Sequence, residues 1–258
     1  MLENFIIIVL LNWLAVTILW LYSLKSKKAD IIDTYWGLGF FIVCIFLFNL
    51  NSNFFLINYI TTALVGIWAF RLAIYLYIRN HNKPEDNRYV KLRKKYGGNF
   101  GLYLVVYLSQ AFLIAIISLP LQTLLSLTQS VDLNYITYIG MVICLVGVAI
   151  ESLADIQLAR FKSNSNNKGI VMDKGLWRYS RHPNYFGDSL FWWGIFIISF
   201  SMTNNFFIII SPIIMTYLLI KVSGIALLEH QIKDKKIGYD EYIKSTSSFI
   251  ILPKRKNN

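Results

Sequence analysis

Long apolar runs recur from one end of the chain to the other, and they limit what the chain can fold into. A helix needs about 20 mostly apolar residues to cross a bilayer. Only 15% of the residues are charged, whereas roughly a quarter are charged in soluble domains. We therefore predict an all-α, polytopic membrane protein in which residues 1–258 form a single integral membrane domain. About seven transmembrane helices are expected, over residues 5–24, 34–50, 54–78, 101–128, 133–159, 186–202 and 205–228.

The basic residues predict how these helices are oriented. Connections 49–53, 129–134 and 203–205 contain no Lys or Arg, and every basic residue except Arg71 and Lys221 lies in the other connections or the C-terminal tail. By the positive-inside rule, the N-terminus lies outside and the C-terminus in the cytoplasm. The net charge of +11 then reflects topology and contact with anionic membrane lipid, and we expect no nucleic-acid partner.

The first apolar run has no basic flank before it and no small-residue cleavage site after it. This pattern predicts a retained first span and not a cleaved signal peptide. A bacterial host would place the protein in the inner membrane.

A polar motif precedes the sixth expected span. It runs from Gly175 to Gly187 and is followed by Asp188. Pro183 suits the first turn of a helix, and Asn184 and Asp188 would then share one face. A membrane protein rarely places so many hydrogen-bonding groups at the mouth of a span without a polar ligand. The alternative is a juxtamembrane loop whose arginines only follow lipid topology.

Other polar residues stand out against the apolar background. Glu151 and Asp155 lie one turn apart near the end of the fifth span, and carboxylates there are expected to face a hydrated cavity. Asp33 either caps the second span or acts in a site. Arg71 either snorkels to the interface or finds a partner inside the bundle. Residues 85–95 predict a short interfacial helix, although a lipid surface does not explain its acidic residues or Tyr89.

The chain lacks the motifs of several other kinds of functional site. The chain has no GxGxxG loop, so it contains no Rossmann-type domain. Three scattered histidines make no metal site, and no Ser–His–Asp order supports a hydrolase. Any cofactor must therefore bind in a cavity at the cytoplasmic side of the bundle itself.

The segment Gly175-Leu-Trp-Arg-Tyr-Ser-Arg-His-Pro-Asn-Tyr-Phe-Gly187 resembles the signature of the steroid 5-alpha-reductase-like superfamily. The resemblance is strongest to its bacterial branch of small membrane proteins, described as 3-oxo-5-alpha-steroid 4-dehydrogenase C-terminal-like. Further matches occur in the expected order, at Asp33–Gly37, Trp68–Leu72, Glu85–Tyr89, Leu228-Glu229 and Gly238–Tyr242. The resemblance covers about residues 30–253.

This resemblance implies an oxidoreductase that binds NADPH from the cytoplasmic side and reduces a carbon–carbon double bond, of enone type, in a sterol-like or other lipid. The residues implied to contact the cofactor are Asp155, Lys162, Arg178, Arg181, His182, Asn184, Tyr185, Asp188, Glu229, His230 and Tyr239. An acid and a tyrosine that bind a substrate carbonyl match Asp33 and either Tyr35 or Trp68. Asp33, Tyr35 and Arg71 form the candidate catalytic set.

Two other functions remain open. Membrane methyltransferases of the isoprenylcysteine or phospholipid type share an Arg-His-Pro-x-Tyr-x-Gly element and bind S-adenosylmethionine. Asn184 and Asp188 with Asp155 fit the reductases better, and the methyltransferases more often have two acids where this chain has Glu229-His230. The second alternative is a lipid-binding membrane protein without catalysis, which needs no cofactor.

Overall fold

The structure is a computed structural model and describes residues 2–50, 55–222, 225 and 238–254. The described part is helical, and its only β-type pairing is an isolated bridge between Ser180 and Ser247. The chain divides into two compact units, residues 1–133 with 202–208 and residues 134–201 with 209–258. Each unit is described by itself, and the single integral membrane domain stays a prediction.

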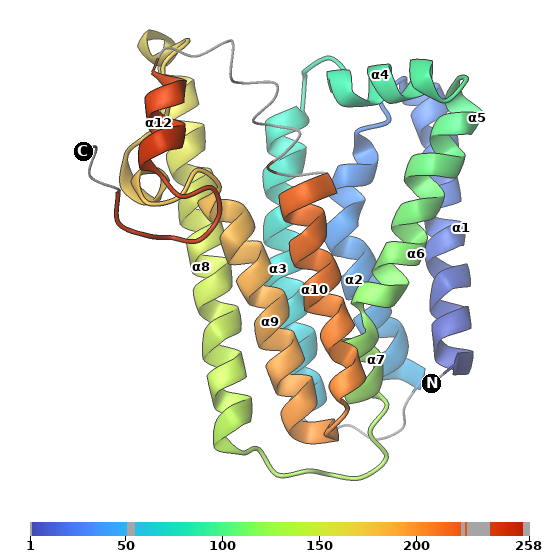
Figure 1. The fold of residues 1–258 in the computed structure, drawn as a ribbon. Coiled ribbons are helices and arrows are strands. Elements are labelled where there is room, and N and C mark those ends of the chain that lie inside the picture. Colours follow the sequence, from blue (N-terminus) through green and yellow to red (C-terminus); the bar gives the residue numbers. More distant parts are fainter. Residues whose placement is uncertain (1, 51–54, 223–224, 226–237, 255–258) are drawn as a thin grey trace. The chain divides into compact units, whose positions relative to one another are not determined.

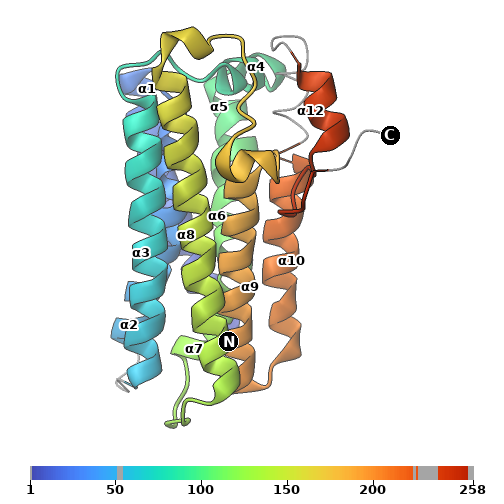
Figure 2. The same ribbon diagram turned by 90° about the vertical axis from the view of Figure 1, so that its left-hand side faces the viewer.

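The first unit contains three long helices, α1 (Leu2–Ser26), α2 (Ile31–Leu50) and α3 (Leu56–Asn80). Helices α2 and α3 run side by side (Figures 1 and 2). Their facing sides bury large side chains such as Phe40 and Trp68, whose ring centroids lie 5.8 Å apart. This packing holds the beginning of α2 next to the end of α3.

A short helix, α4 (Asn87–Lys95), follows α3, and the Asp86 side chain caps it by accepting from the Arg88 N–H. Gly97 and Gly98 have φ values of 75° and 104°, which are accessible to glycine but costly for other residues. They end α4 and turn the chain into the next membrane helix. The predicted interfacial helix at residues 85–95 therefore forms, starting two residues later than expected.

The fourth expected span is divided. It contains α5 (Asn99–Leu102), a π-helical turn η1 (Tyr103–Tyr107), α6 (Leu108–Ile117) and α7 (Leu119–Leu125). The helix breaks at Ser118, where ψ is 3°. Pro120 explains the break, because proline lacks an N–H and its ring crowds the carbonyl four residues earlier. The span therefore ends at Ile117 and not at the expected residue 128.

The second unit is built on α8 (Tyr135–Ser163) and α9 (Pro183–Thr203), which run side by side in Figure 2. Glycines bring the two backbones together: a Cβ on Gly187 would lie 2.6 Å from both the Gly147 oxygen and the Glu151 nitrogen. Small residues at such crossings are typical of helices that associate in membranes. This contact places the acidic end of α8 against the first turns of α9.

The remaining elements complete the two units. They are 3₁₀ turns η2 (Ser165–Asn167), η3 (Gly175–Arg178) and η4 (Phe206–Ile209), then α10 (Ile210–Tyr217), a π-helical turn η5 (Leu218–Val222) and α12 (Tyr239–Ser245). Within the second unit, η3 packs on α8: the Leu176 N–H donates to Gln157 Oε1 at 3.0 Å, and Trp177 Nε1 donates to the Ala154 carbonyl at 3.0 Å.

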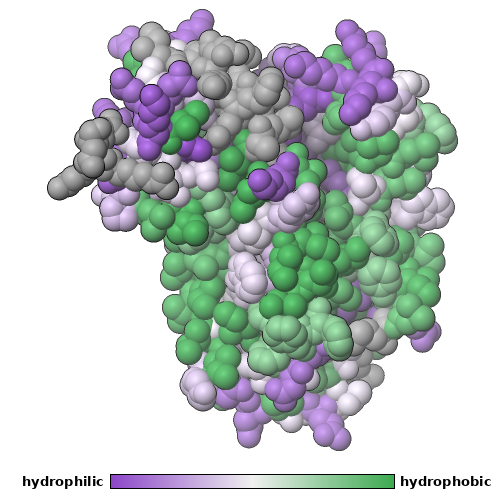
Figure 3. All heavy atoms as spheres, in the orientation of Figure 1, coloured by the Kyte–Doolittle hydropathy of each residue, from purple (hydrophilic) through white to green (hydrophobic). Residues whose placement is uncertain are grey.

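Five helical segments among the described residues are long and apolar enough to cross a membrane: α1, α2, α3, residues 99–117 and α8. Helix α9 and the shorter apolar stretch Phe206–Val222 correspond to the last two expected spans. The end of the seventh span lies outside the described residues. On the face shown in Figure 3, apolar side chains cover α6, and hydrophilic side chains gather over α4. The prediction of an all-α polytopic membrane protein is confirmed, with five spans that meet the length and hydropathy criteria.

Candidate functional site

A hydrogen-bonded pair of polar side chains joins α8 to α9. Asn184 Nδ2 donates to Asp155 Oδ1 at 3.1 Å, and Asp155 is 3% exposed. Asn184 Oδ1 is also buried and accepts no hydrogen bond from any of the described residues. A buried amide oxygen costs free energy unless it is hydrogen-bonded. This acceptor is therefore suited to receive a ligand N–H or O–H group.

Two more carboxylates lie on the same helix faces. Glu151 precedes Asp155 by one turn on α8, and Asp188 follows Asn184 by one turn on α9. Both are buried. The predicted register within each helix is confirmed, because Glu151 and Asp155 both lie in α8 and Asn184 and Asp188 both lie in α9. The close approach of Gly147 and Gly187, which the sequence did not predict, brings the two helices together.

His182 and Tyr185 form an aromatic pair beside this cluster. Their ring centroids are 5.5 Å apart and the rings are nearly parallel, with an interplanar angle of 3°. His182 is buried, and its backbone N–H donates to Ser180 Oγ at 3.1 Å. Pro183 begins α9, as predicted. Residues 182–188 therefore present an amide, a carboxylate and two stacked rings at the beginning of α9.

The structure gives Arg181 a different set of contacts from the one implied for it. Its Nη1 donates to the carbonyls of Ile243 at 2.8 Å and Thr246 at 3.3 Å, and its backbone N–H donates to Ser247. These carbonyls belong to the end of α12, where a cation is favoured by the helix dipole. Arg181 therefore fastens the C-terminal segment, and its cofactor role stays a prediction.

The other basic candidates are more accessible. Lys162 in the last turn of α8 and Arg178 in η3 are both exposed. Tyr239 is buried in α12, 6.1 Å from the ring of Tyr242. Glu229 and His230 lie outside the described residues.

In the first unit, Asp33 belongs to an ion-pair network with α4. Arg88 Nη2 donates to Asp33 Oδ2 at 2.9 Å, and the Tyr89 hydroxyl donates to Asp33 Oδ1. Burial and the neighbouring Asp33 raise the pKa of Tyr89 well above its ordinary value, so the hydroxyl keeps its proton. Asp33 is the third residue of α2 and not its cap. The role of Asp33 at a substrate carbonyl stays a prediction.

The other two catalytic candidates have contacts on α1 and α3. Tyr35 is buried and donates to Asn12 Oδ1 of α1 at 2.8 Å. It lies two residues from Asp33, which places the two side chains almost on opposite sides of the helix. Arg71 is half-buried in α3, with Cζ 6.0 Å from the centroid of the Tyr75 ring. Tyr35 therefore does not share a helix face with Asp33, and the catalytic role of Arg71 stays a prediction.

A second carboxylate fastens α4 to the α1–α2 turn. Glu85 accepts from Arg93 Nη1 at 2.8 Å and Nη2 at 2.6 Å, and from the Ala29 N–H at 2.8 Å. Burial alone would raise the pKa of Glu85, but the hydrogen bonds from Arg93 and Ala29 outweigh it, so the pKa lies below its ordinary value. The Tyr107 hydroxyl completes the arrangement by donating to the Ala29 carbonyl at 3.1 Å. We call Ala29, Glu85 and Arg93 the α4 clamp.

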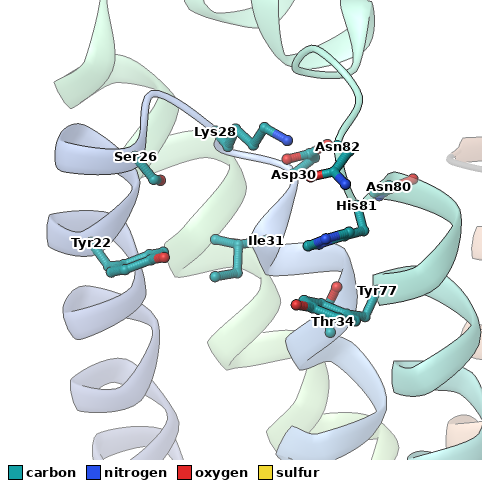
Figure 4. Close-up of a pocket in the computed structure, with 10 residues that line it drawn as sticks. All are labelled: Tyr22, Ser26, Lys28, Asp30, Ile31, Thr34, Tyr77, Asn80, His81 and Asn82. Atoms are coloured by element: carbon teal, nitrogen blue, oxygen red, sulfur yellow. The ribbon is translucent and has the colours of Figure 1, made fainter.

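A pocket of about 320 Å³, lined mostly by residues with polar groups, lies beside this turn, where α1 and α3 end and α2 begins (Figure 4). Lys28 and Asp30 from the turn and His81 after α3 contribute its ionisable groups. None of the residues predicted to act in catalysis or cofactor binding lines it. The sequence analysis missed this pocket because its residues come from three separate segments and match no motif.

The long apolar helices define the chain as a polytopic helical membrane protein. It belongs to the family described as "Protein of unknown function (DUF1295)", whose model matches residues 19–246. This is a membrane family related to steroid 5-alpha-reductase-like proteins, so the superfamily resemblance is confirmed at that level. No curated protein and no solved structure matches the chain.

Proposed function

We propose that the chain is a membrane oxidoreductase that uses NADPH to reduce a carbon–carbon double bond, of enone type, in a sterol-like or other lipid. The observation that carries the proposal is the Asp155–Asn184 pair. Asp155 holds the amide nitrogen of Asn184, so the buried Oδ1 faces away from it as an acceptor. The primary amide of nicotinamide offers a matching N–H group.

The rest of the cluster fits the same cofactor. Glu151 and Asp188 supply carboxylates for ribose hydroxyls, and the His182–Tyr185 pair offers an aromatic surface. The exposed Lys162 and Arg178 suit the pyrophosphate and the 2′-phosphate, which basic side chains bind by charge-assisted hydrogen bonds. When bound, NADPH supplies a hydride to one carbon of the double bond. The neighbouring carbon receives a proton from an acidic group of the protein or from water.

The cofactor is tested by thermal unfolding of the full-length protein in detergent with NADPH, NADH or S-adenosylmethionine. A ligand that binds only the folded state stabilises it by about 2.7 kcal/mol at a hundredfold excess over its dissociation constant. We expect NADPH to raise the midpoint in the wild-type protein and in the control Asn166→Ala, whose side chain is in the exposed η2 turn. Asn184→Ala should lose the effect.

The reaction is tested with NADPH carrying deuterium at the transferred position and membranes that contain the overproduced protein. Mass spectrometry should find one deuterium in a lipid that has gained two hydrogens in total. A midpoint raised by S-adenosylmethionine alone would replace the proposal with methyl transfer. Binding of none of the three compounds would favour a lipid-binding protein without catalysis.

A further inference from the structure

The pocket beside the α1–α2 turn combines opposite charges in a small volume. Lys28 and Asp30 approach it from the turn, and His81 points into it from the end of α3 (Figure 4). The amides of Asn80 and Asn82 add further polar atoms. A ligand that matches such a lining carries both an anionic and a cationic group.

The pocket lies at the level of lipid headgroups. Helix α1 has 25 residues and α3 also has 25, and each is therefore about 37 Å long. The hydrocarbon core of a bilayer is only about 30 Å thick, so the ends of these helices reach the interface. Tyr22 and Tyr77 line the pocket and are 53% and 58% exposed, as expected of tyrosines at a membrane surface.

Asp30 is the most constrained group in the pocket. It is 5% exposed and directly precedes α2, and the Asp86 backbone N–H hydrogen-bonds to it. Burial, and then the nearby Asp33, raise the pKa of Asp30 above its ordinary value, although the positive charge of Lys28 acts in the opposite direction. A cationic ligand group would offset the free-energy cost of the buried carboxylate.

We propose that this pocket binds the zwitterionic headgroup of an aminophospholipid, with the ammonium group at Asp30 and the phosphate at Lys28 and His81. The acyl chains would lie along exposed apolar side chains of α3, such as Ile74, which precedes the pocket residue Tyr77 by about one turn, and Ile78, which follows it. The site uses none of the residues assigned to the cofactor and goes beyond the proposed function.

The test measures lipid binding to the full-length protein by native mass spectrometry. The protein in detergent is titrated with phosphatidylethanolamine or phosphatidylglycerol, which share a phosphate but differ in the amine. We expect phosphatidylethanolamine to bind about tenfold more tightly, because one charge-assisted hydrogen bond is added. Asp30→Asn should reduce its affinity to that of phosphatidylglycerol, and Lys28→Gln should weaken both lipids.

Two controls separate the pocket from general charge and from misfolding. Lys25→Gln removes an exposed lysine of α1 that does not line the pocket, and it should leave both affinities unchanged. Asn is as acceptable as Asp before a helix, so Asp30→Asn should unfold at the wild-type temperature or above in lipid-free detergent. Thr34→Leu fills the pocket from α2 without changing charge and should weaken phosphatidylethanolamine binding.

Equal affinities for the two lipids, or an Asp30→Asn variant that still prefers phosphatidylethanolamine, would overturn the proposal. Free phosphoethanolamine and inorganic phosphate are titrated in the same way to identify the source of the headgroup. We expect each to bind at least about a hundredfold more weakly than the lipid, which also buries apolar surface. Phosphoethanolamine as tight as the lipid would refute a membrane source. None of these outcomes tests the proposed binding of NADPH, because the pocket lies in the first unit and the proposed cofactor site lies in the second.

Discussion

The α4 clamp gives a stability change that can be worked out from its geometry. Replacing Glu85 by Ala removes two hydrogen bonds from Arg93 and one from the Ala29 N–H. The Glu85 side chain is 10% exposed and that of Arg93 is 28% exposed, so water can solvate the arginine but reaches Ala29 less well. Hydrogen bonds to charged groups contribute about 1.5–3 kcal/mol, and exposed ion pairs less than about 1 kcal/mol. We expect Glu85→Ala to destabilise the fold by about 2–3 kcal/mol.

The assay is thermal unfolding in detergent, combined with hydrogen exchange of α4. For a chain of this size, about 2–3 kcal/mol lowers the midpoint by roughly 4–12 °C, and the amides of residues 87–95 should exchange faster. A double-mutant cycle of Glu85→Gln and Arg93→Gln should give a coupling energy of about 1–2 kcal/mol. The control Lys94→Gln changes an exposed neighbour in the same helix. Additive effects of the two substitutions would refute the clamp.

The pH dependence follows from the same contacts. Because the pKa of folded Glu85 lies below its ordinary value of 4.5, the stability it contributes is present above pH 4.5 and is lost as the pH falls through the folded pKa. Glu85→Gln should therefore be less stable than the wild-type protein at pH 7, and the difference should narrow at acidic pH. A difference that widened below pH 4.5 would contradict this sign.

Two further substitutions test the second unit. Gly187→Ala should lower the free energy of unfolding by about 1–3 kcal/mol through overpacking, because its Cβ would meet rigid backbone atoms at 2.6 Å. Gly66→Ala is the control, because its Cβ would meet only the movable Phe41 ring at 3.0 Å. It should lower the free energy of unfolding less in the same thermal unfolding assay. Arg181→Lys should accelerate hydrogen exchange in residues 239–245, since one ammonium group is less suited to bridging the carbonyls of Ile243 and Thr246. Unchanged exchange there would show that Arg181 does not hold α12.

Local features of the second unit followed from the sequence. Pro183 predicted where α9 begins, and helical phase predicted that Asn184 and Asp188, like Glu151 and Asp155, share a face. What phase alone did not predict was the pairing between the two helices. It depends on the close approach of Gly147 and Gly187, which requires knowing that α8 and α9 are neighbours.

Long-range partners could not be predicted in this way. Asp33 is bound by Arg88, 55 residues later in the chain, and Arg181 reaches carbonyls more than 60 residues away. A basic residue in a loop that is predicted to be cytoplasmic satisfies the positive-inside rule whichever acceptor it contacts, so the rule does not identify its partner. The break at Ser118 is different, because Pro120 was visible in the sequence and is itself a signal for a helix end.

The α4 clamp and the polar pocket are mechanically connected, and this yields a last prediction. The Ala29 N–H is held by Glu85, while the Asp86 N–H hydrogen-bonds to Asp30. The segment before α4 thus fixes the turn that carries Lys28 and Asp30, although Glu85 and Arg93 do not line the pocket. If this turn must be held for the headgroup to fit, Arg93→Gln should weaken phosphatidylethanolamine binding several-fold, and Lys94→Gln should not. Because Arg93→Gln removes a positive charge, phosphatidylglycerol serves as the reference. If Arg93→Gln weakens only the binding of the anionic lipid phosphatidylglycerol, Arg93 acts through its charge alone. If it weakens phosphatidylethanolamine binding more than phosphatidylglycerol binding, the turn that carries Asp30 has been displaced.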